Sequence, residues 1–201
     1  MLCVLVVTGV ALAHAQNYER MSDVESDLFA ENAFVNGDYQ TMKNVRRYWV
    51  QEAQRMRSMK NMEFCLTGNS EGILKVTVPA RVLFASNDSI LLASADSYLR
   101  QFLHLVKGSE AVASVIVVGY SDNNGSERYL RTLSGGRARQ IHRWLARQGV
   151  GPAVIRSYGL GNKVPRNANA NMAQREKNRR VSFYFVPNRR MLKNAKRGIL
   201  K

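Results

Sequence analysis

The pattern of apolar and polar positions along this chain predicts an α/β protein. Residues 113–118 form a continuous apolar, β-branched run, which is typical of a central strand covered on both faces. Apolar runs at 153–160 and 181–186 predict two further strands, and Pro187 is expected to end the last one. Two more runs flank a polar turn at 68–72, so residues 62–82 are predicted to form a β-hairpin.

Helical spacing of apolar residues predicts the elements between these strands. A first helix is expected after Ser22, and a second over 39–59, with Met42, Val45, Trp49 and Met56 on a packing face. Polar residues 86–89 are expected to cap a helix over 90–106. The next helix is predicted over 134–147 with Ser134 as its N-cap, and a short one near 172–177.

The N-terminus resembles a secretory leader. Residues 2–12 are apolar, and Ala13-His14-Ala15 follows as a cleavage signature of the A-x-A type. The run is much shorter than the ~20 residues of a membrane-spanning helix. It lacks a preceding Lys or Arg, so an apolar N-terminal strand or helix is the alternative. We predict a signal peptide over 1–15 and export.

The two cysteines add little chemistry to this picture. Cys3 falls in the predicted leader, so Cys65 is expected to stand alone in the mature chain without an internal disulfide. No Cys/His group has zinc spacing, and no metal or cofactor is expected.

Charge is distributed unevenly along the 201 residues. The first 125 hold 11 basic and 13 acidic residues, whereas 126–201 hold 19 basic and 2 acidic ones. Such asymmetry favours a polyanionic neighbour, which could be an acidic wall polymer, anionic lipid head groups or nucleic acid. The alternative is a basic, soluble protein without a polyanionic partner. The basic tail at 188–201 is expected to be a disordered, solvated end, or else to make an electrostatic contact with anionic lipid.

The candidate site lies where the apolar run at 113–118 ends. Asp122 follows this strand, at the sheet edge where binding groups collect in α/β proteins. Arg137 is expected in the first turn of the next helix, beside free backbone N–H groups. A carboxylate and a guanidinium together suit a ligand that carries both an ammonium and a carboxylate. From spacing alone, an ordinary turn aspartate and a solvated helix arginine are the favoured explanation of the pair.

Three motifs identify a family resemblance. Gly-Tyr-Ser-Asp-Asn-Asn-Gly at 119–125, Leu-Ser-Gly-Gly-Arg-Ala at 133–138 and Asn-Arg-Arg-Val at 178–181 occur in the order found in the peptidoglycan-binding domain of the outer-membrane protein A (OmpA) family. The resemblance covers roughly residues 76–186. It implies that Asp122 and Arg137 bind the diaminopimelate residue of the stem peptide, with Ser121 and Asn123 beside them. It also implies supporting roles that fall on Arg175, Asn178, Arg179 and Arg180.

Two positions depart from the family pattern. Leu130 stands where the family usually has an asparagine that braces the site turn, so ligand affinity is uncertain on this ground. Gln174-Arg175 replaces a common Gly-Arg pair.

The resemblance and the patterns together predict a βαβαββ domain, an α/β (α+β sandwich) fold with a mixed sheet, preceded by a hairpin strand and N-terminal helices. The expected divisions are a signal peptide (1–15), a helical extension (16–61), the OmpA-like domain (62–187) and a basic tail (188–201).

Non-covalent peptidoglycan binding is the leading function, in a periplasmic protein associated with the wall or outer membrane of a Gram-negative bacterium. The alternative is a scaffold subunit of a secretion or motor complex that keeps the fold with weak or no wall binding. In either case the N-terminal helices are expected to contact an envelope protein. A nucleic-acid partner is disfavoured by the leader, and an enzyme by the absence of a nucleophile beside His104 or His142.

Overall fold

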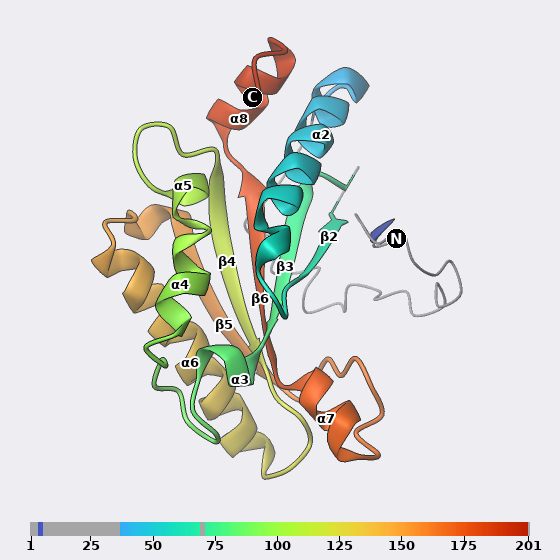
Figure 1. The fold of residues 1–201 in the computed structure, drawn as a ribbon, viewed down its shortest axis with the longest axis vertical. Coiled ribbons are helices and arrows are strands. Elements are labelled where there is room, and N and C mark those ends of the chain that lie inside the picture. Colours follow the sequence, from blue (N-terminus) through green and yellow to red (C-terminus); the bar gives the residue numbers. More distant parts are fainter. Residues whose placement is uncertain (1–3, 6–36, 69–70, 201) are drawn as a thin grey trace.

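A single mixed β-sheet organises the chain, whose computed structural model describes residues 4–5, 37–68 and 71–200 (Figure 1). The sheet has six strands in the order β1-β2-β3-β6-β4-β5. Within the described residues, β4 and β5 pair in parallel and the other neighbours pair antiparallel. The bounds are β1 (Val4–Leu5), β2 (Glu63–Thr67), β3 (Ile73–Pro79), β4 (Ala113–Tyr120), β5 (Ile155–Gly161) and β6 (Arg180–Pro187). This architecture confirms the predicted α/β fold with a mixed sheet.

Helices connect and cover these strands, with α6 beside β4 and β5 and α2 beside β2 and β3 (Figure 1). The short helix predicted near 172–177 is present as α7, and the helix predicted over 39–59 as α2 followed by a 3-10 turn. The bounds are α2 (Tyr39–Arg55), η1 (Met56–Ser58), α3 (Ala80–Leu83), α4 (Ala95–Arg100), α5 (Leu103–Val106), α6 (Glu127–Arg147), η3 (Pro152–Val154), α7 (Met172–Asn178) and α8 (Arg189–Lys196). No helix in the described part of the chain is both long and apolar enough to cross a bilayer.

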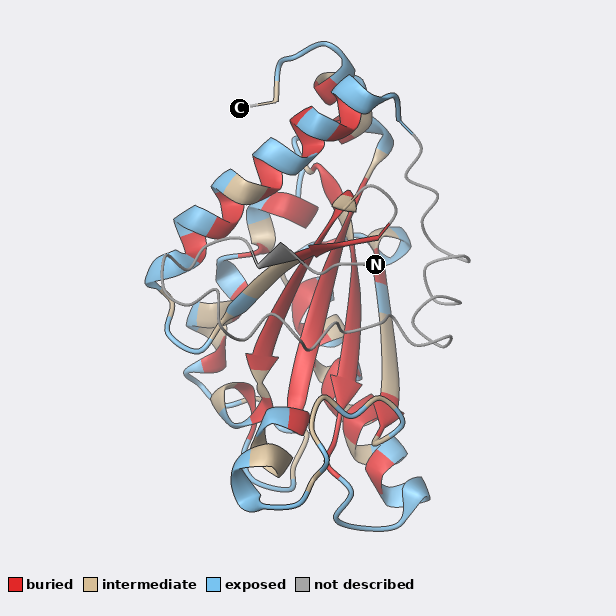
Figure 2. Ribbon diagram, turned by 90° about the vertical axis from the view of Figure 1, so that its right-hand side faces the viewer, coloured by how far each residue is buried: buried red, intermediate tan, exposed pale blue. Residues whose placement is uncertain are grey.

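The two faces of β4 explain its uninterrupted apolar sequence. Val115 and Val117 belong to the main core between sheet and helices, whereas Ile116 and Val118 belong to a second apolar cluster. Successive side chains of a strand point to opposite faces, so a strand buried on both sides needs apolar residues throughout. Figure 2 shows the central strands buried along their length and the helices exposed on their outer faces.

The predicted packing face of α2 lies against the sheet. Met42, Val45, Trp49 and Met56 are all buried, and the indole Nε1 of Trp49 donates to the Gly72 carbonyl oxygen at 2.9 Å. This helix therefore belongs to the same core as the motif-bearing half of the chain.

Close contact between α6 and the sheet depends on two glycines in the strands beneath it. A Cβ atom at Gly119 would lie 2.2 Å from the Ser134 carbonyl oxygen, and one at Gly159 would lie 2.2 Å from the Gly135 backbone nitrogen. Real Cβ contacts are essentially never this short, so the helix backbone approaches β4 and β5 directly. The strand glycines Gly119 and Gly159 thus allow α6 to pack closely against the sheet.

The helix predicted over 90–106 is wrong in its start and its continuity. Helix α4 begins only at Ala95, and α5 follows as a separate turn. Leu91 instead forms an antiparallel bridge with Phe84, and the Leu92 N–H donates to the Leu83 carbonyl oxygen at 2.9 Å. The Asp88 carboxylate, expected at a helix cap, accepts the N–H groups of Ser89 and Ile90 in a local turn.

The basic tail is also more ordered than expected. Residues 189–196 form α8, capped by Asn188, whose side chain accepts the Met191 N–H at 2.9 Å. Met191 and Ala195 are buried, and the Asn44 amide of α2 donates to the Ala195 carbonyl oxygen at 2.9 Å. An apolar stripe at i and i+4 within the basic sequence explains why the segment packs.

Cys65 corrects another expectation, because it is disulfide-bonded and not a lone thiol. The predicted leader and first helix lie outside the described residues, apart from Val4–Leu5, which pairs with β2 as β1. The signal peptide and the domain divisions stay predictions.

Candidate functional site

Asp122 lies just beyond the end of β4, as the sequence predicts. The chain there is fixed to the neighbouring strand, because the Ser121 N–H donates to the Gly161 carbonyl oxygen at 2.8 Å. Asp122 itself is only 4% exposed. A carboxylate buried at a strand end needs polar partners, since an unpaired buried charge is costly.

Arg179 is the main partner of this carboxylate. Its Nε and Nη2 atoms lie 2.8 and 2.7 Å from Oδ2 of Asp122, while the Asn124 N–H donates to Oδ1 at 3.3 Å. Arg179 also approaches Glu176 at 3.6 Å. The aspartate is therefore anchored by Arg179 through one oxygen, and its second oxygen has a longer contact with the turn.

Arg137 lies in the middle of α6 and not in its first turn, because this helix begins at Glu127 and not at Ser134. Ser126 is the N-cap and accepts the Tyr129 N–H at 3.2 Å. Ser134 is instead fully buried and accepts the Gly161 N–H at 2.9 Å. Arg137 therefore does not lie beside the free N–H groups at the start of α6.

The Arg137 guanidinium is buried yet sparsely bonded. It is 5% exposed, its Nε donates to the Asp88 carbonyl oxygen at 2.8 Å, and its carbon lies 5.4 Å from the centre of the Phe84 ring. Burial lowers the pKa of Arg137 from its ordinary value; nearby Tyr129, Asp88 and Asp122 raise this pKa, and Arg179 lowers it. An arginine remains cationic under such an influence. Within the described residues, its Nη groups form no hydrogen bond.

These groups form one polar cluster at the end of β4. Two guanidiniums, Arg137 and Arg179, lie in the electrostatic field of the Asp122 carboxylate, and Glu176 lies 3.6 Å from Arg179. Such a cluster favours a ligand carboxylate at Arg137, while the less tightly bonded Oδ1 of Asp122 suits an ammonium.

The other predicted residues divide into two groups. Ser121 is buried and donates through its hydroxyl to the Asp122 carbonyl oxygen at 3.0 Å, whereas Asn123 is exposed on the turn. Arg175 and Arg180, expected to support the site, contact the loop before β6: Arg175 donates to the Asn169 carbonyl oxygen, and Arg180 donates to the Val164 carbonyl oxygen at 3.0 Å. The guanidinium carbon of Arg180 also lies 3.8 Å from the centre of the Tyr120 ring.

Asn178 is the centre of that loop. It is fully buried; its Oδ1 accepts the N–H groups of Arg166 and Asn167 at 2.8 and 3.0 Å, and its Nδ2 donates to the Asn167 carbonyl oxygen at 2.9 Å. The bonds of Asn178 place the neighbouring Arg179 against Asp122. Its contribution to the site is therefore positional.

Sequence reasoning missed three neighbours of Arg137 and Asp122. Phe84 and Asp88 come from the loop before α4, and Tyr129 comes from the first turn of α6. Tyr129 was missed because the helix was predicted to begin at Ser134, after this residue. The sequence Ser126-Glu127 did contain a helix start signal. Leu130, by contrast, is 1% exposed and lies beneath the Gly125 turn.

The OmpA family model matches residues 83–179, which include this whole cluster. Among curated proteins, the probable lipoprotein YiaD of Escherichia coli K12 is 30% identical over 138 residues, 69% of this chain and 62% of YiaD. The peptidoglycan-binding protein ArfA of Mycobacterium tuberculosis H37Rv is 42% identical over 71 residues, 35% of this chain and 22% of ArfA. The chain thus spans less than two thirds of either relative.

A solved structure shares the fold. A MotB-like protein from Desulfovibrio vulgaris superposes with a TM-score of 0.64 at 22% identity, covering 74% of this chain and 97% of that protein. At this identity the likeness describes the arrangement of helices and strands alone.

Proposed function

Because residues 83–179 of this chain form a domain of the OmpA family, we propose that it binds peptidoglycan non-covalently, as a recognition protein and not an enzyme. The relative ArfA is by name a peptidoglycan-binding protein, which supports this proposal. The observation that carries it is the buried Arg137, whose Nη groups have no hydrogen-bond partner among the described residues and which lies near the Asp122 carboxylate.

The ligand is the diaminopimelate residue of the stem peptide. Its free end carries an ammonium and a carboxylate on the same carbon. The carboxylate binds the Arg137 guanidinium as a fork, and the ammonium binds Oδ1 of Asp122. Arg179 holds Oδ2 of the same carboxylate and keeps it in place. Each charge-assisted contact contributes about 1.5–3 kcal/mol, so loss of either weakens binding roughly 10- to 100-fold.

The biological role that follows is a tether between the cell wall and the outer membrane or an envelope complex, in the periplasm of a Gram-negative bacterium. The competing role is a scaffold subunit of an envelope machine that keeps the fold and has weak or no peptidoglycan binding. Leu130, in place of the family's asparagine under the site turn, favours that alternative.

A wall sedimentation experiment separates the two roles. The purified chain is mixed with insoluble peptidoglycan, with and without an excess of free diaminopimelate, and the pelleted fraction is measured. The proposal predicts pelleting that free diaminopimelate suppresses and that Asp122→Asn and Arg137→Gln each weaken by roughly 10-fold or more in affinity. Arg143→Gln, an exposed arginine on the same helix, is the matched control and keeps parental binding.

A well-folded parent that stays in the supernatant would instead assign the chain to the scaffold role. The search for partners would then turn to α2 and to the residues before it.

A further inference from the structure

The end of the sheet opposite Asp122 carries a concentrated basic surface. Strand β4 begins at Ala113, which pairs with Pro187 immediately before α8, and the site lies beyond its other end. Eight strand residues span about 26 Å. Figure 1 shows α8 and the first half of α2 together at this end, away from α7 and the turn that follows β4.

Helix α8 presents its charge on one side only. Met191 and Ala195 face the core, while Arg189, Lys193 and Arg197 recur at every fourth position on the exposed side. The neighbouring α2 adds exposed basic residues of its own. The basic residues of this surface are Lys43, Arg46, Arg47, Arg189, Arg190, Lys193, Lys196 and Arg197.

Local acids neutralise only part of this charge. Arg190 pairs with Glu110, and Arg46 lies 2.9 Å from Glu71. The triad of Arg189, Lys193 and Arg197 forms no ion pair with any described residue. A surface with this excess of positive charge attracts an anionic partner over a Debye length of about 8–10 Å.

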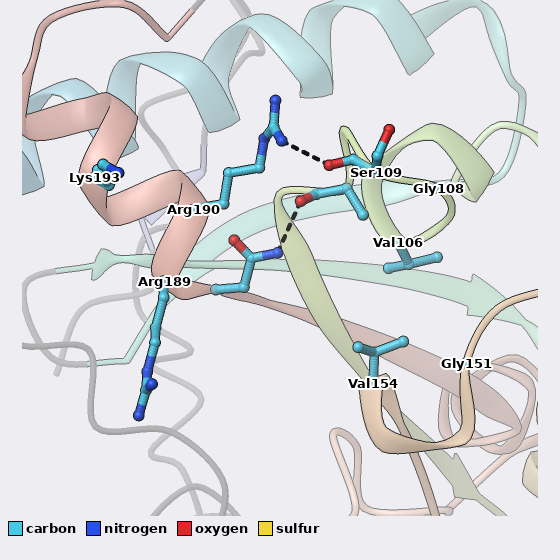
Figure 3. Close-up of a pocket in the computed structure, with 10 residues that line it drawn as sticks. Val106, Gly108, Ser109, Gly151, Val154, Arg189, Arg190 and Lys193 are labelled. Carbon is cyan, nitrogen blue, oxygen red and sulfur yellow. Dashed lines mark hydrogen bonds between the residues drawn. The ribbon is translucent and has the colours of Figure 1, made fainter.

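Two further features distinguish the partner. Exposed apolar side chains lie at the same end of the molecule: Ile199 is 53% exposed just beyond α8, and Tyr39 is 82% exposed at the start of α2. Beside α8 lies a recess of about 620 Å³, lined on one side by Arg189 and Lys193 and on the other by the apolar Val106 and Val154 (Figure 3). Basic residues interspersed with apolar and aromatic ones are suited to the interface of a bilayer.

We propose that this α8 surface docks the domain onto an anionic phospholipid bilayer, with phosphate head groups on the basic triad and Ile199 and Tyr39 at the acyl boundary. The geometry then points the Asp122 end away from the membrane. A free phosphate has no acyl chain, so it could bind the basic triad but could not cover Ile199 and Tyr39.

Vesicle flotation of the full chain tests the proposal. Vesicles of phosphatidylcholine with about 30% phosphatidylglycerol are compared with phosphatidylcholine alone. Each basic residue near an anionic surface contributes about 1 kcal/mol, so the triple variant Arg189→Gln, Lys193→Gln, Arg197→Gln is expected to bind the anionic vesicles about 100-fold more weakly. Binding by the parent is expected to fall roughly 10-fold or more as salt rises from about 50 to about 500 mM.

Helix α6 supplies a matched control. Arg139, Arg143 and Arg147 have the same spacing and exposure, so their triple change to glutamine removes the same charge from another surface. Vesicle binding by this variant is expected to stay within about 3-fold of the parent, and all variants share the same N-terminal segment.

Three results overturn the proposal: equal losses in the two triple variants, equal binding to neutral and anionic vesicles, or complete displacement by millimolar inorganic phosphate, which would indicate a free-phosphate site. Wall sedimentation of the α8 variant is expected to be unchanged. Failure of membrane docking is therefore distinguishable from failure of wall binding.

Discussion

Arg179 binds a single carboxylate oxygen of Asp122. Both its Nε and its Nη2 lie within 2.8 Å of Oδ2, which leaves Oδ1 with a 3.3 Å contact to the Asn124 N–H. One oxygen thus anchors the carboxylate and the other can serve a ligand. The two residues are 57 positions apart, so the fold itself brings this ion pair together.

Arg179→Ala is expected to destabilise the protein by about 2–3 kcal/mol, because it leaves the buried Asp122 carboxylate without its charged partner. Urea unfolding measures the loss. The double variant Arg179→Ala, Asp122→Asn is expected to lose at least about 1 kcal/mol less unfolding free energy than the sum of the losses in the two single variants. Additive losses would mean that the ion pair contributes nothing beyond its separate parts.

Leu130→Ala is expected to cost about 2–4 kcal/mol of unfolding free energy, because the leucine is 1% exposed and its removal leaves a cavity under the Gly125 turn. Wall affinity falls with it, since this turn follows Asp122. Leu92→Ala, at a residue 37% exposed, is the control and is expected to cost less than about 1 kcal/mol. A tolerated Leu130→Ala with parental wall binding would argue that the turn needs no support from this helix.

Gly159→Ala is expected to cost about 3 kcal/mol or more, because the new Cβ would lie 2.2 Å from the Gly135 backbone nitrogen and force α6 off the sheet. The matched change is Gly151→Ala, where φ is −64° and nothing lies within 4 Å of the added atom. Thermal unfolding should separate the two variants clearly, with Gly151→Ala within about 1 kcal/mol of the parent. Similar melting curves would contradict the close helix–sheet contact.

Alkaline pH is expected to weaken the packing of α2. Burial raises the pKa of Tyr48 to about 12 from 10.0, and the adjacent Glu52 carboxylate adds to the rise. The folded protein therefore disfavours the phenolate; this contribution is intact below about pH 10 and is lost as pH rises toward about 12. The loss amounts to at most about 2.7 kcal/mol. Urea unfolding of the parent and of Tyr48→Phe across this pH range isolates the contribution of Tyr48. If the unfolding free energies of the two proteins fall in parallel with pH, the raised pKa of Tyr48 is contradicted.

Much of the fold follows from local patterns. The double-sided apolar run of β4, the stripe of α2 and the short α7 all carry their signals within the segment itself. The prediction of a helix over 90–106 was wrong because Leu91 forms a β-bridge with Phe84. The spacing of apolar residues alone does not distinguish this contact from packing within a helix. The α8 segment was missed because its overall charge obscured a two-residue packing stripe, Met191 and Ala195.

The candidate site was predictable in its residues and not in its contacts. Motif resemblance pointed to Asp122 and Arg137, and both are buried in one cluster. The bond from Arg137 to Asp88 and the pair between Arg179 and Asp122 depend on how loops from separate strands converge, which no local pattern encodes. The same limit applied to Ser134, whose role appears only where β5 ends beside α6.

The most direct test of the account compares two stem peptides by calorimetric titration. One carries diaminopimelate and the other carries lysine, which retains the ammonium and lacks the side-chain carboxylate. The account predicts that the parent prefers the diaminopimelate peptide by about 10- to 100-fold, that Arg137→Gln abolishes this preference, and that Asp122→Asn weakens both peptides alike. A preference that persists in Arg137→Gln, or a parent that binds both peptides equally, would contradict it.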